Sequence, residues 1–374
     1  MKIVFINNYL HEYYIGGAEE SSRILIKELS KSNRVYTISF YKDNIIIKEK
    51  KVINIFLKRN RFQDLRYATH FFNQLNISLA FKVKSIIDRI APDIVHFNNI
   101  QGYPAILIRF LDQYKIVHTL RDYNTICFRN SLYKNGICDQ CNLCKLQSVY
   151  KKSLYANIDG IVSNSNLTLS LHNQYGYKRG QQSIIYAGYD MPSIKIHKNS
   201  LTDIRFGYLG KINKAKGCHL LNEIGRQILE ATGNKLLVAG TGNQSIIDSF
   251  DKKSIDYLGY MKPLDFYSQI NVVIITSVWY DPLPRIIYES ISFNVIPILS
   301  IHSGGKTIVQ SIDKNLIFDP NNRGDFERVI SYLKTTSNLK SIYKSLKRIG
   351  EGKQFTIEKT SYEYMEFYKK IIND

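Results

Sequence analysis

Apolar segments of strand length alternate with helical patterns along the whole of this 374-residue chain. Such alternation is typical of parallel sheets wrapped by helices, because parallel strands need crossover connections that cover both sheet faces. The first half has five predicted strands, at Lys2–Ile6, Arg34–Phe40, Asp93–Phe97, Lys115–Thr119 and Gly160–Ser163. The pattern restarts in the second half with Ile204–Leu209, Lys235–Ala239, Asn271–Thr276 and Val295–Ser300.

This restart predicts an α/β chain with two Rossmann-like parallel-sheet domains, and the length is sufficient for two cores. We expect residues 1–190 to form the first domain and residues 201–355 the second, with a polar linker at 191–200. A last helix within 356–374 is expected to pack back on the first domain. If the two domains face each other across a cleft, their strand ends and their ligands lie in that cleft.

The chain is strongly basic, with 51 Lys and Arg against 32 Asp and Glu and a formal net charge of +19. Nucleic acid, an anionic membrane surface, anionic small substrates and a generally Lys-rich surface are the competing explanations. No arginine-rich tail or nucleic-acid-binding motif occurs, so we expect no nucleic-acid partner. The basic and aromatic stretch from Lys58 through Phe72 is a candidate membrane-facing segment; a solvated loop or core segment is the alternative.

Two features of the sequence predict where in the cell the protein is located. No apolar run approaches the length of about 18 residues that indicates a membrane-spanning helix. The N-terminal segment MKIVFINNY becomes polar too early for a signal peptide and is interpreted as a first buried strand. We therefore expect a cytoplasmic protein, with peripheral contact to the cytoplasmic face of the inner membrane as a further expectation.

Two lysines stand on a glycine-bounded loop directly after a predicted strand of the second half. Gly210 and Gly217 bound this loop, and Lys211 and Lys216 lie within it. Two cations beside backbone that a ligand can approach closely suit a diphosphate, although solvated surface lysines are the common alternative. We interpret both lysines as donor-binding and catalytic candidates that stabilise charge on a leaving diphosphate.

A second polar segment follows a later predicted strand and runs from Asp281 to Glu289. Pro284 is expected to open a helix whose second turn carries Glu289. A buried carboxylate there needs partners such as ribose hydroxyls, whereas an exposed helix glutamate is the plainer alternative. Asp281 is either a donor ligand or the cap of this helix. Leu283, Pro284 and Arg285 complete the donor-binding candidates, because a first helical turn offers free N–H groups to phosphate.

Two motifs of the first half lie where ligands are expected. Gly16 and Gly17 precede the first helix and either bind a phosphate at its N-terminus or form a tight turn. Arg121 and Asp122 follow the strand at Lys115–Thr119. Both are catalytic candidates: Asp122 bonds the transferred sugar or orients Arg121, with a turn-forming aspartate as the alternative.

Four cysteines fall within eighteen residues of the first half, at Cys127, Cys138, Cys141 and Cys144. Four thiolates suffice for a structural zinc ion in tetrahedral coordination. Reduced packing cysteines are an almost equal alternative, and a redox role or an iron–sulfur cluster is a further one. Disulfides are not expected in a cytoplasmic protein.

In order and spacing these motifs resemble the retaining, nucleotide-sugar-dependent glycosyltransferases of family 4, which have the GT-B fold. The resemblance covers nearly the whole chain, and the matching segments are Gly16-Gly17-Ala18-Glu19, Val95 to Asn99, Thr119 to Tyr123 with the cysteines, Ile161 to Ser165, Lys211 to Gly217 and Asp281 to Glu289. It implies that Lys211 and Lys216 grip the donor diphosphate. It also implies that Glu289 is the ribose-binding second acid of an E-x7-E motif, with Gly304 and Gly305 in the loop that often follows.

The chain departs from the family pattern at three positions. Lys211 stands where an Arg is common, Asp281 replaces the first Glu, and Arg121 replaces the His often found before the aspartate. Each change alters reach or chemistry: Lys lacks the bidentate fork of Arg, and Asp is shorter than Glu by one methylene. Any role that the imidazole of this His has in the family is therefore in question for this chain, which has Arg121 instead.

The resemblance implies transfer of a sugar from a UDP- or GDP-sugar to a saccharide acceptor, expected to be lipid-linked, in bacterial surface-polysaccharide assembly such as O-antigen or capsule. No metal cofactor is expected for the chemistry, because cations and helix N-termini can stabilise the leaving diphosphate. A nucleotide-sugar epimerase and a non-catalytic nucleotide-sugar-binding protein of the same fold are the alternatives.

Overall fold

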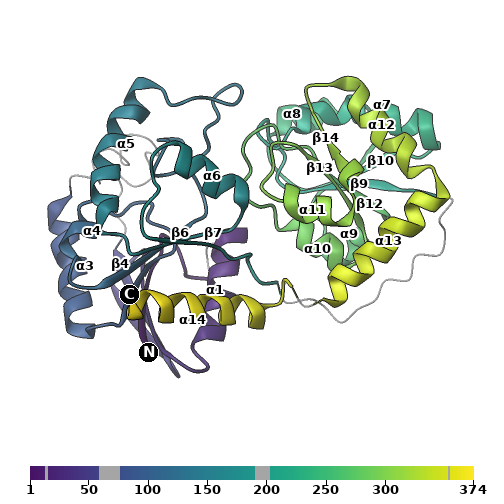
Figure 1. Cartoon of the computed structure of the whole chain (residues 1–374). Coiled ribbons are helices and arrows are strands. Elements are labelled where there is room, and N and C mark those ends of the chain that lie inside the picture. Colours follow the sequence, from purple (N-terminus) through teal and green to yellow (C-terminus); the bar gives the residue numbers. More distant parts are fainter. Residues whose placement is uncertain (13–15, 59–75, 190–202, 353) are drawn as a thin grey trace. The chain divides into compact units, whose positions relative to one another are not determined.

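The computed structural model describes residues 1–12, 16–58, 76–189, 203–352 and 354–374. They divide into two compact units, the first within 1–132, 138–188 and 355–374, the second within 133–137 and 189–354. Each unit contains a parallel or largely parallel sheet with helices packed on it (Figure 1), which confirms the predicted fold class. The predicted linker at 191–200 lies outside the described residues, as does the stretch from Lys58 through Phe72 apart from Lys58 itself.

The sheet of the first unit has the strand order β3-β4-β2-β1-β5-β6-β7-β8 in the described residues. Neighbouring strands are parallel except for the antiparallel pair of β3 and β4. The strands are β1 (Lys2–Ile6), β2 (Arg34–Tyr41), β3 (Ile45–Glu49), β4 (Val52–Lys58), β5 (Ile94–Phe97), β6 (Lys115–Leu120), β7 (Gly160–Ser163) and β8 (Gln181–Ile184).

The first unit contains six α-helices in the described residues. They are α1 (Gly17–Leu29), α3 (Ile77–Ile90), α4 (Leu107–Phe110), α5 (Asn142–Leu154), α6 (Asn166–Gln174) and α14 (Ile357–Asn373), with a short 3₁₀ turn at Tyr155–Asn157. The last helix of the chain, α14, contacts α1 and β6 (Figure 1). Phe367, Tyr368 and Ile371 of α14 join the core formed by α1 and the central strands.

The second unit has a six-stranded sheet in the described residues, with the order β11-β10-β9-β12-β13-β14 and parallel pairing throughout. Its strands are β9 (Phe206–Leu209), β10 (Leu236–Ala239), β11 (Ile255–Tyr257), β12 (Val272–Ile275), β13 (Ile296–Ser300) and β14 (Ile317–Phe318). Its helices are α7 (Leu221–Thr232), α8 (Gln244–Asp248), α9 (Pro263–Tyr267), α10 (Ile286–Ser292), α11 (Lys306–Ile312), α12 (Arg323–Leu333) and α13 (Thr336–Glu351), with 3₁₀ turns at Cys218–Leu220 and Lys314–Leu316. None of the helices in the described ranges has the length and apolar character needed to cross a bilayer.

The period-two alternation of strand side chains sends successive residues to opposite faces of the first sheet. His96 of β5 and Thr119 of β6 therefore point to the α14 face, where His96 Nδ1 lies 2.6 Å from the Tyr368 hydroxyl and Nε2 lies 2.7 Å from Thr119 Oγ1. His118, one residue before Thr119, points to the other face and bonds the hydroxyl of Tyr155. These imidazoles tie the helices to the sheet.

Burial keeps these histidines neutral. It lowers the pKa of His118 to about 3 and that of His172, on α6, to about 4. Burial also lowers the pKa of His96 well below its ordinary value, and the charge of Arg121 adds to that effect. An imidazole that stays neutral to such low pH is a structural group in this fold, because it is bonded to neighbouring side chains or backbone and is removed from water.

Acidification should therefore destabilise the first unit. Between pH 6.5 and the folded pKa values, the unfolded chain takes up protons at His118 and His172 that the folded state does not bind, so stability falls as the pH falls. At pH 5 the loss is about 2 kcal/mol per histidine. Denaturant unfolding at pH 7 and pH 5 measures it, and in His118→Gln the drop should be smaller by about that amount. An equal free energy of unfolding at both pH values would contradict the assignment.

Candidate functional site

In the second unit, the loop after β9 is held against the end of β12 by backbone geometry. Gly217 has a φ of 73°, and a Cβ at this position would collide with the backbone carbonyl of Thr276. The Thr276 hydroxyl donates to the Lys216 carbonyl at 2.6 Å, and the Val278 N–H donates to the Ala215 carbonyl at 3.0 Å. Only glycine permits this approach without strain, so Gly217 fixes the backbone that carries Lys216.

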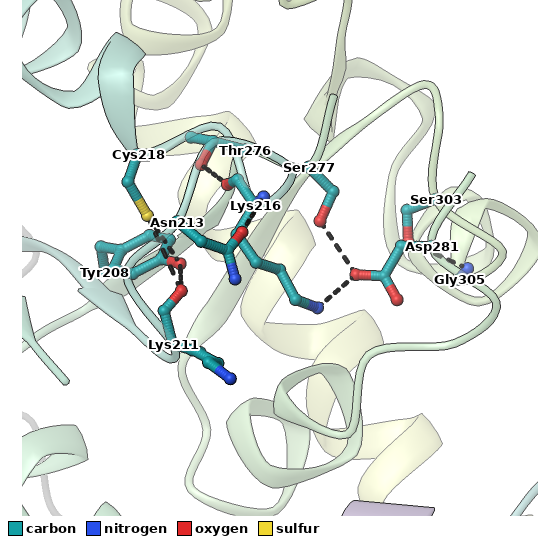
Figure 2. Close-up of polar contacts among 10 residues, drawn as sticks. All are labelled: Tyr208, Lys211, Asn213, Lys216, Cys218, Thr276, Ser277, Asp281, Ser303 and Gly305. Atoms are coloured by element: carbon teal, nitrogen blue, oxygen red, sulfur yellow. Dashed lines mark hydrogen bonds and ion pairs between the residues drawn. The ribbon is translucent and has the colours of Figure 1, made fainter. Parts of the chain in front are cut away.

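The ammonium group of Lys216 is paired with the carboxylate of Asp281 (Figure 2). Lys216 Nζ lies 2.6 Å from Asp281 Oδ2, and the Ser277 hydroxyl donates to the same oxygen at 2.9 Å. Asp281 is buried, whereas the Lys216 side chain is 31% exposed. The carboxylate therefore holds the ammonium from the protein side while leaving part of it open to solvent. Asp281 is a positioning group for Lys216 in this geometry.

Lys211, the other predicted cation of the loop, lies at the surface. Its carbonyl accepts a hydrogen bond of 3.1 Å from the Tyr208 hydroxyl, which anchors the backbone and not the side chain. Figure 2 shows its ammonium apart from the Lys216–Asp281 pair. Within the described part of the chain, Lys211 has no ion pair closer than 4.0 Å. Its charge is available to an anionic ligand.

The helix after Asp281 begins later than predicted. α10 starts at Ile286 with Arg285 at its N-cap, so Glu289 lies in the first turn and not the second. Pro284 is buried before the helix, and its carbonyl accepts the Ile287 N–H at 3.2 Å. The prediction that Pro284 opens the helix is therefore wrong, and so is the alternative that Asp281 caps it. Pro284 ends the preceding loop, and the first i to i+4 bond of the helix runs from the Glu289 N–H to the Arg285 carbonyl at 3.1 Å.

Glu289 is largely buried and has protein partners. Its Oε1 lies 3.6 Å from Arg285 Nη2, and its Oε2 accepts a hydrogen bond of 3.3 Å from the Tyr267 hydroxyl. Burial raises the pKa of Glu289, while the charge of Arg285 and the Tyr267 bond oppose that rise. The Arg285 guanidinium in turn lies 5.7 Å from the ring centroid of Tyr189. The plain reading of Glu289 as an exposed helix residue does not hold.

The segment after β13 joins the same site through its backbone. The Gly304 N–H donates to the Asp281 carbonyl at 2.8 Å, and Asp281 bridges Ser303 as in a parallel sheet. Ser303 is buried, and its hydroxyl accepts from the Gly305 N–H at 3.4 Å (Figure 2). The structure thus brings Lys216, Asp281 and the Gly304–Gly305 loop together, although they are far apart in the sequence. Leu283, partly exposed, lies between Asp281 and α10.

In the first unit, Arg121 belongs to a buried polar network at the ends of three strands. Its Nε donates to Asn98 Oδ1 at 2.8 Å. The Asn98 amide donates in turn to Asn7 Oδ1 at 2.8 Å and to the Ser22 hydroxyl at 2.7 Å. Asn98 is fully buried, so these bonds satisfy groups that water cannot reach. They fix the direction in which Arg121 leaves β6.

Asp122 is held by a different set of donors. Its Oδ1 accepts from the Asn124 N–H at 2.8 Å, and its Oδ2 accepts from the Gln101 amide at 2.5 Å. Asn98, His118, Arg121, Asp122 and Asn124 line a small recess at this point. Burial raises the pKa of Asp122, and the two hydrogen bonds and the charge of Lys151 oppose that rise. The Asn124 bond is of the kind expected for a turn-forming aspartate, and a catalytic role of Asp122 stays a prediction.

Lys151 of α5 is a buried lysine that sequence reasoning missed. Its Nζ donates to the Asn124 carbonyl at 2.6 Å and lies 3.3 Å from Asn124 Oδ1. Burial lowers the pKa of Lys151 to about 7, and Asp122 is the leading group that opposes this. The available signal was helical spacing, because Lys151 lies on the same helix face as Cys144 and Gln147. A lysine on an amphipathic helix is ordinarily assigned to the solvent side.

Gly16 and Gly17 stand where α1 begins, with Gly16 at the N-cap. The carboxylate of Glu19 lies over Gly16, in the space that a Cβ would occupy. This carboxylate sits at the positive end of the helix, where it is favoured electrostatically. An anionic ligand at Gly16 and Gly17 would have to displace it, so their assignment to the donor stays a prediction.

The four cysteines of the first unit are free thiols. Cys141, the N-cap of α5, lies with its Sγ 3.4 Å from that of Cys144. Cys127 accepts a hydrogen bond from the Arg129 N–H, and the Cys138 thiol donates to the Asp139 carbonyl at 3.2 Å. Among the residues that the structure describes, no three His, Cys, Asp or Glu side chains are arranged as a metal site. Structural zinc stays a prediction.

Comparison with known proteins bears on both units. Residues 192–352 match the family model described as "Glycosyl transferases group 1". Over 343 residues the chain is 27% identical to an "Uncharacterized 42.6 kDa protein in cps region" of Klebsiella pneumoniae, covering 85% of this chain and 90% of that protein.

Solved structures agree with the whole fold. Sucrose-phosphate synthase of Thermosynechococcus elongatus aligns with a TM-score of 0.76 and 14% identity, over 100% of this chain and 99% of that one. HepE of Anabaena, solved in complex with UDP, aligns with a TM-score of 0.72 and 14% identity, over 99% and 100% of the two chains. At these identities the likeness establishes the two-unit architecture.

Lys151→Met should change how stability depends on pH. From pH 7 up to the ordinary lysine pKa, the unfolded chain holds a proton on Lys151 that the folded state has largely lost, so this residue makes stability rise with pH. Between pH 7.5 and 9, the free energy of unfolding of the wild type should rise relative to that of Lys151→Met by about 1 kcal/mol per pH unit. Denaturant unfolding measures the difference, and Lys145→Met on the exposed side of α5 is the matched control. Equal slopes for both variants would refute a buried, neutralised lysine.

The zinc hypothesis predicts about one zinc ion per chain in protein purified without chelators. Cys141→Ser with Cys144→Ser should remove the metal, whereas Cys218→Ser, in the second unit, should retain it. Elemental analysis of the purified protein provides the measurement. Metal-free wild-type protein would instead support the interpretation of these residues as packing cysteines.

Proposed function

We propose that this chain moves a sugar from a nucleoside diphosphate to a saccharide acceptor with retention of configuration. The basis is that the chain belongs to the group 1 glycosyltransferases, which form family 4 and have the GT-B fold. In this reaction the bond between the anomeric carbon and the diphosphate oxygen breaks. A bond from the same carbon to the acceptor oxygen forms, and the acceptor's proton passes to the departing diphosphate. The donor is a UDP- or GDP-sugar, with UDP supported by its presence in the HepE structure.

The observation that carries the proposal is the Lys216–Asp281 pair beside the exposed Lys211. A leaving diphosphate gains negative charge as its bond to the sugar breaks, and fixed cations stabilise that charge. Lys216 is held in place by Asp281 and by the backbone at Gly217, so little reorganisation is needed when a ligand binds. The shorter Asp281, in place of the family's glutamate, suits this positioning role because its oxygen reaches Lys216 at 2.6 Å.

Glu289 is the proposed ligand of the donor ribose. A largely buried carboxylate costs free energy unless charges or hydrogen bonds compensate it. Arg285 and Tyr267 provide part of this compensation through contacts of 3.6 and 3.3 Å, both longer than strong bonds to a carboxylate. Hydroxyl donors of a ribose would complete it. Arg285 is then a positioning group for Glu289, and the segment from Leu283 through Pro284 is proposed to line the donor site.

Arg121 and Asp122 are proposed to act on the sugar side of the reaction. Asp122 has a partly exposed carboxylate in a recess of the first unit, with its orientation set by Gln101 and Asn124. Such a carboxylate can accept hydrogen bonds from sugar hydroxyls. Lys151, when protonated, stabilises the ionised form of Asp122 from the interior. The arginine in place of the family's common histidine cannot act as a base near neutral pH, so Arg121 is assigned binding and not proton transfer.

The biological setting that we propose is the synthesis of a surface polysaccharide such as a capsule, on a lipid-linked acceptor. The relative encoded in a cps region supports this assignment, since it covers most of both chains. The net charge of +19 is compatible with an anionic membrane surface as a partner. No metal is invoked for the chemistry, because the two lysines provide the positive charge that the leaving group needs.

Titration with UDP, GDP and their sugar derivatives, followed by turnover assays, tests the proposal. Lys216→Ala should lower turnover by about two orders of magnitude, because one well-placed charge stabilises the transition state by roughly 3–4 kcal/mol. Lys214→Ala is the matched control: it removes a lysine from the same loop, where Lys214 is exposed and makes no ion pair in the described chain.

The outcomes distinguish the alternatives. Near-normal turnover in Lys216→Ala would remove this lysine from the site. Donor isomerised without an acceptor would indicate an epimerase, and nucleotide binding without hydrolysis or transfer would indicate a non-catalytic binding protein. Absence of binding to every nucleotide in the series would overturn the proposed function.

A further inference from the structure

Helix α5 of the first unit has an inverted distribution of side chains. Three large aliphatic residues on its outer side, Leu143, Leu146 and Val149, are 65%, 66% and 66% exposed. The side that packs on the protein includes the polar residues Gln147, Ser148 and Lys151. An ordinary surface helix has the opposite arrangement, with the aliphatic residues inside. The network around Asn124 explains the inner side, whereas no contact within the described residues explains the aliphatic outer side.

The spacing makes the three aliphatic residues one surface. Positions three apart on a helix lie on the same side of it, so Leu143, Leu146 and Val149 form a continuous stripe over two turns. We call these three residues the α5 stripe. Isolated exposed hydrophobic residues need no explanation, whereas a contiguous apolar stripe on a soluble surface marks an interaction site.

The charges beside the α5 stripe are positive. Lys145 is exposed next to it, and Lys152 is partly exposed, with its Nζ 5.9 Å from the ring centroid of Tyr177. The sequence from Gln140 to Ile158 contains no acidic residue. The nearest acids on either side are engaged: Asp139 accepts from the Tyr175 hydroxyl at 3.3 Å, and Asp159 accepts from the Ile116 N–H at 2.7 Å.

We propose that the α5 stripe and its flanking lysines dock the protein on an anionic lipid surface. Aliphatic side chains flanked by lysines without acids match the chemistry of such an interface, where the apolar groups enter the acyl boundary and the ammonium groups meet the anionic headgroups. A second protein copy is a poorer fit, because stable protein interfaces use about 20–30 residues on each side. The candidate segment from Lys58 through Phe72 is not needed for this inference.

The inference deepens the proposed function, since a lipid-linked acceptor would lie at such a surface. It also has a structural consequence. The same helix that meets the lipid on one side holds Lys151 against Asn124 on the other, and Asn124 lines the recess at Asp122.

Co-sedimentation of the full chain with phosphatidylcholine vesicles, with and without phosphatidylglycerol, tests the proposal at low salt. Wild-type protein should bind the anionic vesicles, and binding should fall as salt is added. Leu146→Gln with Val149→Gln should weaken binding by about tenfold or more, because two buried aliphatic groups are lost. Ile46→Gln, which removes a 63% exposed aliphatic residue from β3, is the matched control and should bind like the wild type.

Three results would overturn the proposal. These are no binding of wild-type protein to anionic vesicles, equal binding by the double variant, or a fall in solution mass from dimer to monomer in that variant, which would assign the α5 stripe to a second copy. Vesicle binding is measured without donor or acceptor, and UDP affinity is measured without vesicles. A failure of the proposed glycosyl transfer is therefore recognised separately from a failure of lipid docking.

Discussion

The organisation of the second unit depends on one charge pair, Lys216 with Asp281, and on the glycine that permits it. A buried carboxylate requires a cation or several donors, and Asp281 obtains both from Lys216 and Ser277. The ammonium reaches it only because Gly217 lets the loop approach the end of β12. The pair thereby joins the segments after β9 and β12, and the Asp281 backbone adds the segment after β13. The ammonium of Lys216 is thereby held in place by the protein itself.

The first unit uses the same principle with different groups. Charged and amide side chains gather where β1, β5 and β6 end, and each is held by a partner from another element. Asn98 links β5 to Arg121, and Lys151 brings a buried amino group from α5 to the Asn124 carbonyl. Such networks are costly unless every member is satisfied, so they hold their side chains in defined directions. Preorganised charge of this kind is what group transfer from a diphosphate requires.

Helix α5 connects this internal network with the outer surface. Its inner side consists partly of polar residues, and Gln147 and Lys151 of that side donate to the Asn124 carbonyl. Its outer side is aliphatic, which the interior of the protein does not explain. A helix with polar residues on its inner side and aliphatic residues on its outer side does not follow the usual amphipathic pattern. The usual pattern therefore predicts, wrongly, that Lys151 faces solvent. The same error hides the α5 stripe, because an apolar face is ordinarily assigned to the core.

The sequence by itself determined the fold class and most of the strands, because continuous apolar runs such as Lys2–Ile6 and Gly160–Ser163 can only be buried between helices. It did not reveal the β3–β4 hairpin, whose outer strand is largely exposed and whose turn depends on Lys50 with a φ of 47°. It indicated Lys211, Lys216, Asp281 and Glu289 as candidates through residue type and spacing. Only the tertiary structure decided that Asp281 pairs with Lys216, that Glu289 has Arg285 and Tyr267 as partners, and that Lys151 is buried. Local patterns specify which chemistry a side chain can offer, whereas its partner and its exposure arise from contacts between segments far apart in the chain.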